Sequence, residues 1–325
     1  MKENCIEKHL YRFFYFRRAP IFALVKEGYS SAMIRHPEGY QTCMHRFSPK
    51  GGKGIPVLLI HGSMEDSRIY HSASGKGFAP FLAQSGFDVF VPDLPGTGKS
   101  TPAASRSFDH SQQQFIDSDI NDYLEHIRRF YPAEKIRLGG HSWGGVLALA
   151  WYAKFGSTET IGSMVFFGTK RKLATQSLRR LFMVDILWTG VGKLSTSLFG
   201  YFPAKKLKMG SENEPASFYH ETSKWVHGNE WRDLKSGEDL AKRLQGKTPP
   251  PLLFFAGMND KVLGNPQDVK RLITETGSES AKYILLSKEN GNAKDYDHIN
   301  MLTAKTCPED HFPIAAQWLM AGNLK

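Results

Sequence analysis

Apolar and mixed segments alternate along the chain from residue 56 onward. Six short runs are almost wholly apolar, as expected for strands buried on both faces of a parallel sheet: residues 56–60, 87–91, 136–138, 163–167, 252–256 and 283–286. Four stretches between them are predicted as helices: residues 77–85, 112–131, 144–155 and 266–276. Strands that alternate with helices predict an α/β fold with a doubly wound, mostly parallel sheet.

The residues before this alternation have a different pattern. Two segments with strand character flank the turn His36-Pro37-Glu38-Gly39 and predict a β-hairpin. Residues 1–28 form a separate N-terminal segment, in which residues 11–18 are aromatic and basic. We interpret residues 11–18 as a helix packed on the domain, with a segment lying on a membrane surface as the alternative.

Residues 170–248 interrupt the alternation of strands and helices. This stretch is rich in large apolar side chains, among them Leu181, Phe182 and Trp188, so it is expected either to bury itself on the sheet domain or to cover a ligand cavity. An insertion between strands of such a sheet lies naturally over the carboxyl ends of the strands. We therefore predict an α/β core of residues 29–169 and 249–325, with a helical cap of residues 170–248.

The charge of the 325-residue chain is unevenly distributed. The formal net charge is +10, and residues 170–248 hold 15 Lys and Arg against 8 Asp and Glu. Residues 1–50 hold 9 against 4, while the remaining residues hold 18 against 20. Such segments favour contact with an anionic group, for example a membrane surface, although an ordinary solvated surface is an equally good interpretation. Nucleic-acid binding is not expected, because basic and aromatic residues interleave only over a very short stretch.

Cysteine usage and hydropathy limit the remaining classes. Cys5, Cys43 and Cys307 are far apart and form no CxxC pair, so neither a disulfide framework nor a zinc module is expected. The first residues are charged and lack an apolar leader, and no run approaches the ~18 apolar residues of a membrane-spanning helix. We expect a cytoplasmic protein, with peripheral membrane contact as an option. The sequence does not indicate the number of subunits.

A GxSxG motif, Gly140-His141-Ser142-Trp143-Gly144, lies between a predicted strand and a predicted helix. Glycines two positions before and after the serine allow the backbone to bend sharply there. The bend exposes the serine hydroxyl at the carboxyl end of the sheet. Ser142 is therefore the predicted nucleophile.

A serine hydroxyl needs a base in contact with it, and the base needs an acid that orients it. Asp260 follows one predicted strand and His298 lies in the loop after the next, so both can reach the sheet edge at which Ser142 lies. We predict Asp260 as the acid and His298 as the base. His311 is the alternative base, expected in or near the last helix, and Asp268 is the alternative acid, expected on the helix after Asp260.

The loop after the first parallel strand contains His61-Gly62-Ser63-Met64. Its position predicts that the backbone N–H groups of Ser63 and Trp143 form an oxyanion hole, with Met64 as the neighbouring possibility. His61 and His141 are interpreted as residues that support these loops through hydrogen bonds.

The segment Asp93–Ser100 ends like a phosphate-binding P-loop. It has Asp93 where that loop requires glycine, and the residues after Ser100 do not predict the helix that a P-loop opens. Nucleotide hydrolysis is therefore not expected.

The motifs that carry a family resemblance are His61-Gly62, Asp93–Ser100, Gly140–Gly145, Asp260 and His298. Taken together, they resemble the α/β-hydrolase superfamily, in its serine esterase and lipase branch. The resemblance implies the α/β-hydrolase fold and a serine hydrolase that needs neither metal nor cofactor. It also implies that Asp93–Ser100 is a structural turn. Residues 200–207 are similar to a group of predicted bacterial hydrolases with a helical cap.

The substrate follows less directly from the sequence. An aromatic cap favours an apolar acyl group, and the basic charge of the cap favours an anionic or membrane-located substrate. We expect a small-molecule carboxylic ester, with acyl transfer, thioester hydrolysis and amide or peptide hydrolysis as alternatives on the same residues. A protein of this fold that only binds a ligand is the alternative of another class.

Overall fold

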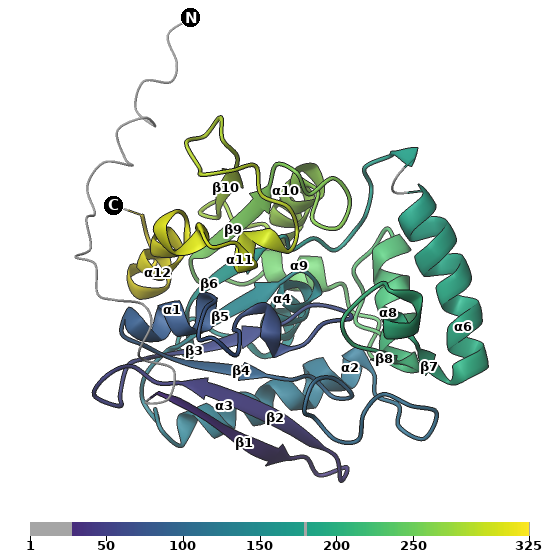
Figure 1. The fold of residues 1–325 in the computed structure, drawn as a ribbon, viewed down its shortest axis with the longest axis horizontal. Coiled ribbons are helices and arrows are strands. Elements are labelled where there is room, and N and C mark those ends of the chain that lie inside the picture. Colours follow the sequence, from purple (N-terminus) through teal and green to yellow (C-terminus); the bar gives the residue numbers. More distant parts are fainter. Residues whose placement is uncertain (1–27, 179–180, 325) are drawn as a thin grey trace, which may run out of the picture.

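The computed structural model describes residues 28–178 and 181–324, so the aromatic and basic stretch 11–18 lies outside the described residues. An eight-stranded sheet forms the centre of the molecule, in the order β1-β2-β4-β3-β5-β6-β9-β10 (Figure 1). The strands are β1 (Tyr29–Arg35), β2 (Gln41–Phe47), β3 (Ile55–Ile60), β4 (Phe87–Pro92), β5 (Ile136–His141), β6 (Ile161–Phe167), β9 (Leu252–Gly257) and β10 (Lys282–Leu286).

The sheet is parallel from β4 to β10 and antiparallel at its other edge. β1 and β2 form the predicted hairpin around the turn that starts at His36, and β2 pairs antiparallel with β4. All neighbours from β4 to β10 are parallel. The prediction of a mostly parallel, doubly wound sheet is confirmed.

The strand β5 is longer than predicted. The apolar run ends at Leu138, but β5 pairs with β3 as far as Gly140 and with β6 as far as His141. Glycine disfavours a strand interior; here a neighbouring strand on each side supplies hydrogen bonds that hold the two glycines extended. Ser142 therefore follows the strand directly.

Helices cover both faces of the sheet, and side chains of each strand alternate between two apolar clusters. Val57 and Leu59 of β3 face a cluster with α1 (Phe78–Gln84), α11 (Asn300–Thr303) and α12 (Phe312–Ala321). Leu58 and Ile60 face the other cluster, which contains α3 (Ile120–Arg128), α4 (Trp143–Phe155), α9 (Leu240–Gln245) and α10 (Pro266–Thr276). A strand buried on both faces explains why these runs contain hardly any polar residues.

The predicted helix 112–131 is wrong as a single regular element. It consists of α2 (Gln112–Gln114), a π-helical turn (Phe115–Asp119) and α3, and it ends at Arg128. The π-helical turn carries Asp119, which is fully buried and accepts a hydrogen bond from Tyr40 Oη. Tyr40 lies beside the hairpin turn, so this contact joins segments far apart in the sequence, and a helical pattern does not encode it.

The inserted stretch 170–248 is mainly helical and lies beyond one end of the sheet (Figure 1). It contains a π-helical segment, η4 (Leu181–Val191), which continues into α6 (Gly192–Phe199). A small hairpin of β7 (Tyr201–Phe202) and β8 (Glu214–Pro215) follows, with α7 (Ala204–Leu207) between its strands, and then α8 (Ala216–His227) and α9. α9 packs against α4 and α10 of the core. The boundary between cap and core stays a prediction.

None of the helices in residues 28–178 and 181–324 is both long and apolar enough to cross a membrane.

Candidate functional site

Ser142 lies at a sharp turn between β5 and α4. Its φ is 50° and its ψ is −120°, a conformation that costs free energy for any residue other than glycine. The neighbouring glycines have no room for a side chain: a Cβ at Gly140 would lie 2.4 Å from Gly145 Cα, and one at Gly144 would lie 2.2 Å from Ile60 O. The Ser142 N–H donates to Phe167 O at 2.8 Å. The turn is thus fixed by close backbone packing, as the motif predicts.

Asp260 and His298 are in direct contact. Asp260 follows β9, His298 lies in the loop after β10, and the distance from His298 Nδ1 to Asp260 Oδ2 is 2.5 Å. Because the carboxylate accepts, the proton of a neutral imidazole lies on Nδ1, and Nε2 is left as an acceptor. Burial raises the pKa of Asp260, but the nearby His298, the Gly264 N–H and Lys170 outweigh burial, so the pKa is lowered overall.

The residue before Ser142 contacts the histidine of this pair. This residue, His141, has its ring centroid 4.7 Å from that of His298, and His141 Nε2 lies 2.9 Å from the His298 carbonyl oxygen. Within the described part of the chain no hydrogen bond joins Ser142 Oγ to His298. Such bonds are often long before substrate binds. The structure therefore brings all three predicted residues to one edge of the sheet.

The alternative residues have other contacts. His311 is fully buried before α12, with Nε2 2.7 Å from Met301 O. Asp268 lies on α10, as expected, and it accepts from the N–H groups of Ala174 and Thr175 at 3.2 and 3.3 Å. Asp268 therefore anchors the start of the inserted stretch and makes no contact with His298.

The loop after β3 presents one backbone N–H toward the cap and leaves another unused. Met64 N–H donates to Glu214 Oε1 at 2.8 Å, and Ser63 Oγ donates to the same oxygen at 2.6 Å. Among the described residues, the N–H groups of Ser63 and Trp143 have no acceptor. Trp143 is the first residue of α4, where a helix has no internal partner for its N–H groups. This arrangement favours Ser63 over Met64 as an oxyanion donor.

His61 and His141 both support loops, as interpreted from the sequence. His61 Nε2 accepts from Leu94 N–H at 3.1 Å, so its Nδ1 donates to Gly62 O at 2.9 Å. His141 Nδ1 lies 2.7 Å from Glu65 Oε1, while its Nε2 faces a carbonyl oxygen. Since both partners of His141 can only accept, both ring nitrogens donate and the imidazole is charged.

The charged His141 forms a buried ion pair with Glu65. Burial lowers the pKa of His141, but Glu65, the His298 carbonyl and Asp260 together outweigh burial and raise the pKa overall. Glu65 Oε1 also accepts from the Gly62 N–H. The pair therefore connects the loop after β3 with the backbone of His298.

The segment Asp93–Ser100 forms a turn around a carboxylate. Asp93 accepts from the N–H groups of Ser67 at 3.0 Å and Lys99 at 2.8 Å, and from His45 Nε2 at 3.1 Å. A phosphate-binding loop directs such N–H groups at a phosphate, whereas here the Asp93 side chain occupies them. The segment therefore resembles a P-loop in sequence, but its own carboxylate takes the place that a phosphate would have.

Family comparison agrees with this architecture. Residues 55–286 match the alpha/beta hydrolase fold family, which is most of the chain. The chain belongs to the α/β-hydrolase family. Among solved members, it is similar to a soluble variant of monoglyceride lipase from Saccharomyces cerevisiae, with a TM-score of 0.65 and 17% identity over 95% of this chain and 100% of the lipase. A thermophilic esterase from Thermogutta terrifontis gives a TM-score of 0.55 and 18% identity, covering 90% and 98%. At such identities the likeness concerns the fold alone.

Curated α/β-hydrolase relatives match over a shorter stretch. A haloalkane dehalogenase from Psychrobacter cryohalolentis is 30% identical over 117 residues, 36% of this chain and 35% of the dehalogenase. A proline iminopeptidase from Lactobacillus delbrueckii subsp. bulgaricus is 30% identical over 129 residues, 39% and 40% of the two chains. The chain therefore spans only 35–40% of the length of these relatives. Their names imply different reactions, so the family alone leaves the substrate open.

Two buried charged residues of this α/β-hydrolase site were not predicted. Glu214 contacts Ser63 although 151 positions separate them, and nothing in the local sequence of β8 indicates such a contact. Lys170 is buried after β6, with Nζ 5.8 Å from the centroid of the Trp143 ring. Burial lowers the pKa of Lys170 to about 8, although Asp260 and Asp268 oppose this shift. The position of Lys170 directly after a strand end was the only signal in the sequence.

The inserted stretch lies against the loop after β3 in this α/β hydrolase. A small hollow lies between His61, Gly62 and Thr97 of the core and Glu214, Pro215 and Phe218 of the cap. A Cβ at Gly62 would lie 2.9 Å from Ser142 Cβ, so the hollow adjoins the nucleophile turn. The Trp225 ring of α8 lies 6.3 Å from the Trp143 ring. Phe218 of the inserted stretch therefore lines a hollow next to the nucleophile turn, and Trp225 lies close to the residue after Ser142.

Titration of Glu214 is expected to affect the stability of the fold. Burial raises the pKa of Glu214 to about 7 from an ordinary value of 4.5, although the bonds from Ser63 and Met64 oppose this. The folded state then binds more protons than the unfolded state between these pH values, so the free energy of unfolding falls as pH rises through that window. Glu214→Gln removes this titration and keeps an oxygen for both donors.

The check is a series of thermal unfolding curves from pH 4.5 to pH 8. The melting temperature of the wild type minus that of Glu214→Gln should decrease across the window. Glu279→Gln, outside this contact, serves as the matched control and should give a flat difference. A flat difference for Glu214→Gln as well would contradict the raised pKa.

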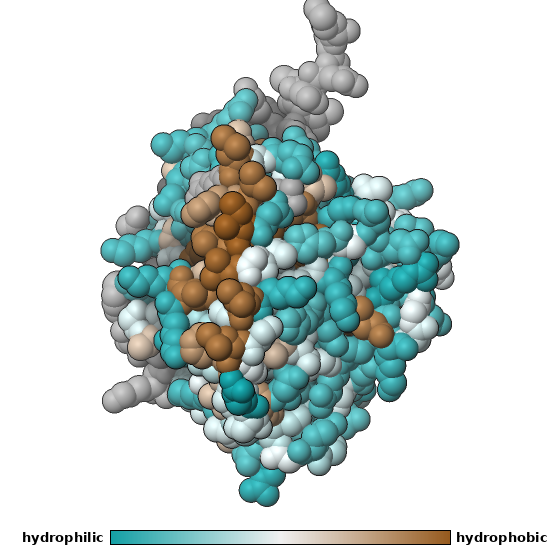
Figure 2. Space-filling view, turned by 90° about the vertical axis from the view of Figure 1, so that its right-hand side faces the viewer, coloured by the Kyte–Doolittle hydropathy of each residue, from teal (hydrophilic) through white to brown (hydrophobic). Residues whose placement is uncertain are grey.

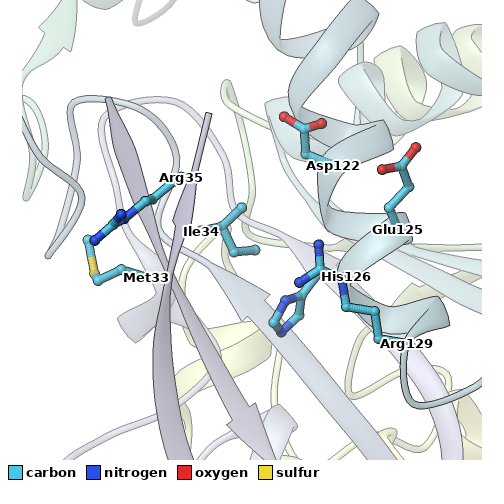
Figure 3. Close-up of a pocket in the computed structure, with 7 residues that line it drawn as sticks. All are labelled: Met33, Ile34, Arg35, Asp122, Glu125, His126 and Arg129. Atoms are coloured by element: carbon cyan, nitrogen blue, oxygen red, sulfur yellow. The ribbon is translucent and has the colours of Figure 1, made fainter. Parts of the chain in front are cut away.

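A larger hollow lies away from this site. It measures about 340 Å³ and lies between β1 and α3, lined by Met33, Ile34, Arg35, Asp122, Glu125, His126 and Arg129 (Figure 3). Asp122 is held there by His36 Nδ1 at 2.7 Å. None of its lining residues belongs to the motifs described above, so we do not assign the chemistry to this hollow.

Proposed function

We propose that the protein is a serine hydrolase that cleaves a carboxylic ester through an acyl-enzyme. One observation carries the proposal: Ser142 lies at a strained turn between strand and helix, at the same edge of the sheet as a hydrogen-bonded His298–Asp260 pair whose histidine ring contacts His141. Within the described residues, the N–H groups of Trp143, which follows Ser142, and of Ser63, in the loop packed against Ser142, have no acceptor. This is the set of groups that acyl transfer to a serine requires.

The reaction has two halves in this proposal. His298 Nε2 takes the proton from Ser142 Oγ as the oxygen attacks the ester carbonyl, and the N–H groups of Ser63 and Trp143 stabilise the oxyanion. The imidazolium gives its proton to the leaving alcohol, and the acyl group remains on Ser142. Water then attacks the acyl-enzyme with His298 again as base, which releases the acid and restores the serine. Asp260 keeps the proton on Nδ1 and stabilises the imidazolium.

The identity of the nucleophile argues against dehalogenation, the reaction in the name of one relative. A serine that displaces a halide from an alkyl carbon becomes an alkyl ether. An ether has no carbonyl for water to attack, so the enzyme would not be regenerated. An acyl group on the same serine forms an ester that water can hydrolyse.

The cap supports an apolar acyl group. Phe218 and Trp225 lie near the loop after β3 and the nucleophile turn, and apolar side chains line most small-molecule sites. Acyltransfer, thioester hydrolysis and amide or peptide hydrolysis use the same groups and differ in the leaving group or the acceptor. A ligand-binding protein without catalysis would need no base in contact with an orienting carboxylate.

The experiment that tests this proposal is covalent labelling followed by a substrate series. A fluorophosphonate should modify the protein once, and mass spectrometry of the peptides should place the adduct on Ser142. p-Nitrophenyl esters from acetate to palmitate then measure the preferred acyl length, beside the matching thioesters and anilides, and added alcohols test acyl transfer. A folded protein that neither labels nor turns over any of these compounds would refute the proposal.

A further inference from the structure

The helix formed by η4 and α6 has an exposed apolar face. Leu194 is 73% exposed and Leu198 is 65% exposed. The other exposed apolar residues of this helix are Leu181, Phe182, Ile186 and Val191. Figure 2 shows hydrophobic residues gathered in a stripe that hydrophilic residues border on both sides. Apolar stripes of this kind mark interaction sites, because solvent exposure of so many leucines is unfavourable.

The opposite side of this helix is firmly packed. Val184 and Trp188 are buried, and Tyr219 Oη of α8 donates to Trp188 O at 2.5 Å. The rings of Trp188 and Tyr219 lie 5.5 Å apart in a T-shaped arrangement. The apolar face is therefore the outer side of a helix whose inner side is already packed on this chain. The helix cannot bury the apolar face on the core without giving up these inner contacts.

The chain around the apolar face is strongly basic. Residues 172–208 contain seven Lys and Arg and one acidic residue, Asp185. Lys193, Lys205, Lys206 and Lys208 are exposed. Lys206 Nζ lies 4.5 Å from the centroid of the Phe199 ring, at the end of α6. Apolar side chains on a helix with lysines beside them are the pattern of helices that lie in a membrane interface.

From this apolar face and the lysines beside it we propose that the helix of η4 and α6 docks on an anionic lipid surface. Its leucines and Phe182 enter the boundary between headgroups and acyl chains, and the lysines contact lipid phosphates or carboxylates. A second copy of this chain is a poorer occupant, because it would bring the same basic residues against one another. Docking at this face does not depend on the esterase proposal.

Docking would bring the candidate site close to lipid. The same inserted stretch carries Glu214, which contacts the loop after β3, and Phe218, which lines the hollow beside it. The apolar face and the approach to Ser142 thus belong to one packed unit, joined through Tyr219 of α8 and the ring of Phe202, stacked 4.5 Å away. An apolar substrate could then enter from the membrane without crossing water.

The test is sedimentation of the full-length protein with vesicles of phosphatidylcholine alone or with about 30% phosphatidylserine. The wild type should bind the anionic vesicles, and salt at about 0.5 M should weaken binding by screening the lysines. Leu194→Ser with Leu198→Ser, which removes apolar area without adding charge, should lower the partition coefficient by about tenfold or more. Met320→Ser, at an exposed apolar position on α12, is the matched control and should bind like the wild type.

Three outcomes would overturn the proposal. The wild type could fail to bind anionic vesicles, or the double variant could bind as well as the wild type, which would assign binding to another segment. The protein could also form a dimer that the double variant abolishes, as measured by light scattering, which would assign the apolar face to self-association. A melting temperature of the double variant equal to that of the wild type would show that its fold is intact.

Discussion

Ser142→Ala should abolish turnover of the best ester substrate while leaving the fold unchanged. Without Oγ no acyl-enzyme forms, and loss of a serine nucleophile lowers kcat by about 10⁶-fold in enzymes of this mechanism. The thermal unfolding temperature should hardly change, because alanine and serine are equally strained at a φ of 50°. The measurements are kcat under saturating ester, fluorophosphonate labelling and a melting curve.

The matched control for this substitution is Ser197→Ala. Ser197 is exposed on α6 and its hydroxyl donates only within its own helix, so labelling and kcat should equal those of the wild type. The Ser142→Ala protein must be free of wild-type enzyme. If it then still turns over ester at more than a small fraction of the wild-type rate, another residue is the nucleophile.

Much of the core could be predicted because its signals are local. A strand with neighbours and helices on both faces must be apolar along its length, so runs such as 163–167 stand out from the sequence. The signal for the nucleophile turn is also local. Gly140 and Gly144 are required because a side chain at either position would collide with the same turn or with the strand beside it. Ser142, Asp260 and His298 each follow a predicted parallel strand, so their order along the chain also predicts that they meet at one edge of the sheet.

The parts that could not be predicted depend on contacts between distant residues. The extension of β5 to His141 comes from hydrogen bonds supplied by β3 and β6, and the π-helical turn carries Asp119 to Tyr40. Glu214 reaches Ser63 only because the hairpin of the cap folds over the loop after β3. The hydrophobic pattern of these segments does not encode the contacts between them.

The expectation for the inserted stretch was wrong in one respect. Its apolar residues were expected to be buried on the sheet domain or over a cavity. Val184 and Trp188 follow that rule, whereas Leu181, Phe182 and Ile186 are exposed. Apolar residues on two faces of a helix can be buried by two different partners. Here the inner face packs on this chain, and we assign the outer face to the proposed lipid surface.

Asp260→Asn should lower kcat by about 10⁴-fold near pH 7. An asparagine amide can donate to His298 Nδ1, which favours the tautomer with the proton on Nε2, and that nitrogen can no longer act as the base. Because the pKa of Asp260 is lowered in the folded state, its carboxylate stabilises the fold above the ordinary aspartate pKa, and this contribution is lost as pH falls through the lowered value. The difference in melting temperature between wild type and Asp260→Asn should therefore be largest at neutral pH and shrink in acid.

Asp268→Asn is the matched control, because it changes the alternative acid. Asp268 accepts from backbone N–H groups and from Arg271, and an amide oxygen can still accept from those donors. We expect kcat within about threefold of the wild type, since no catalytic group contacts this side chain. A loss only in Asp268→Asn would move the orienting acid from the strand end after β9 to the helix α10. An equal loss of kcat in both variants would contradict a role that belongs to Asp260 alone. Loss confined to Asp260→Asn, with kcat affected more than KM, would place its effect in the chemical step rather than in substrate binding.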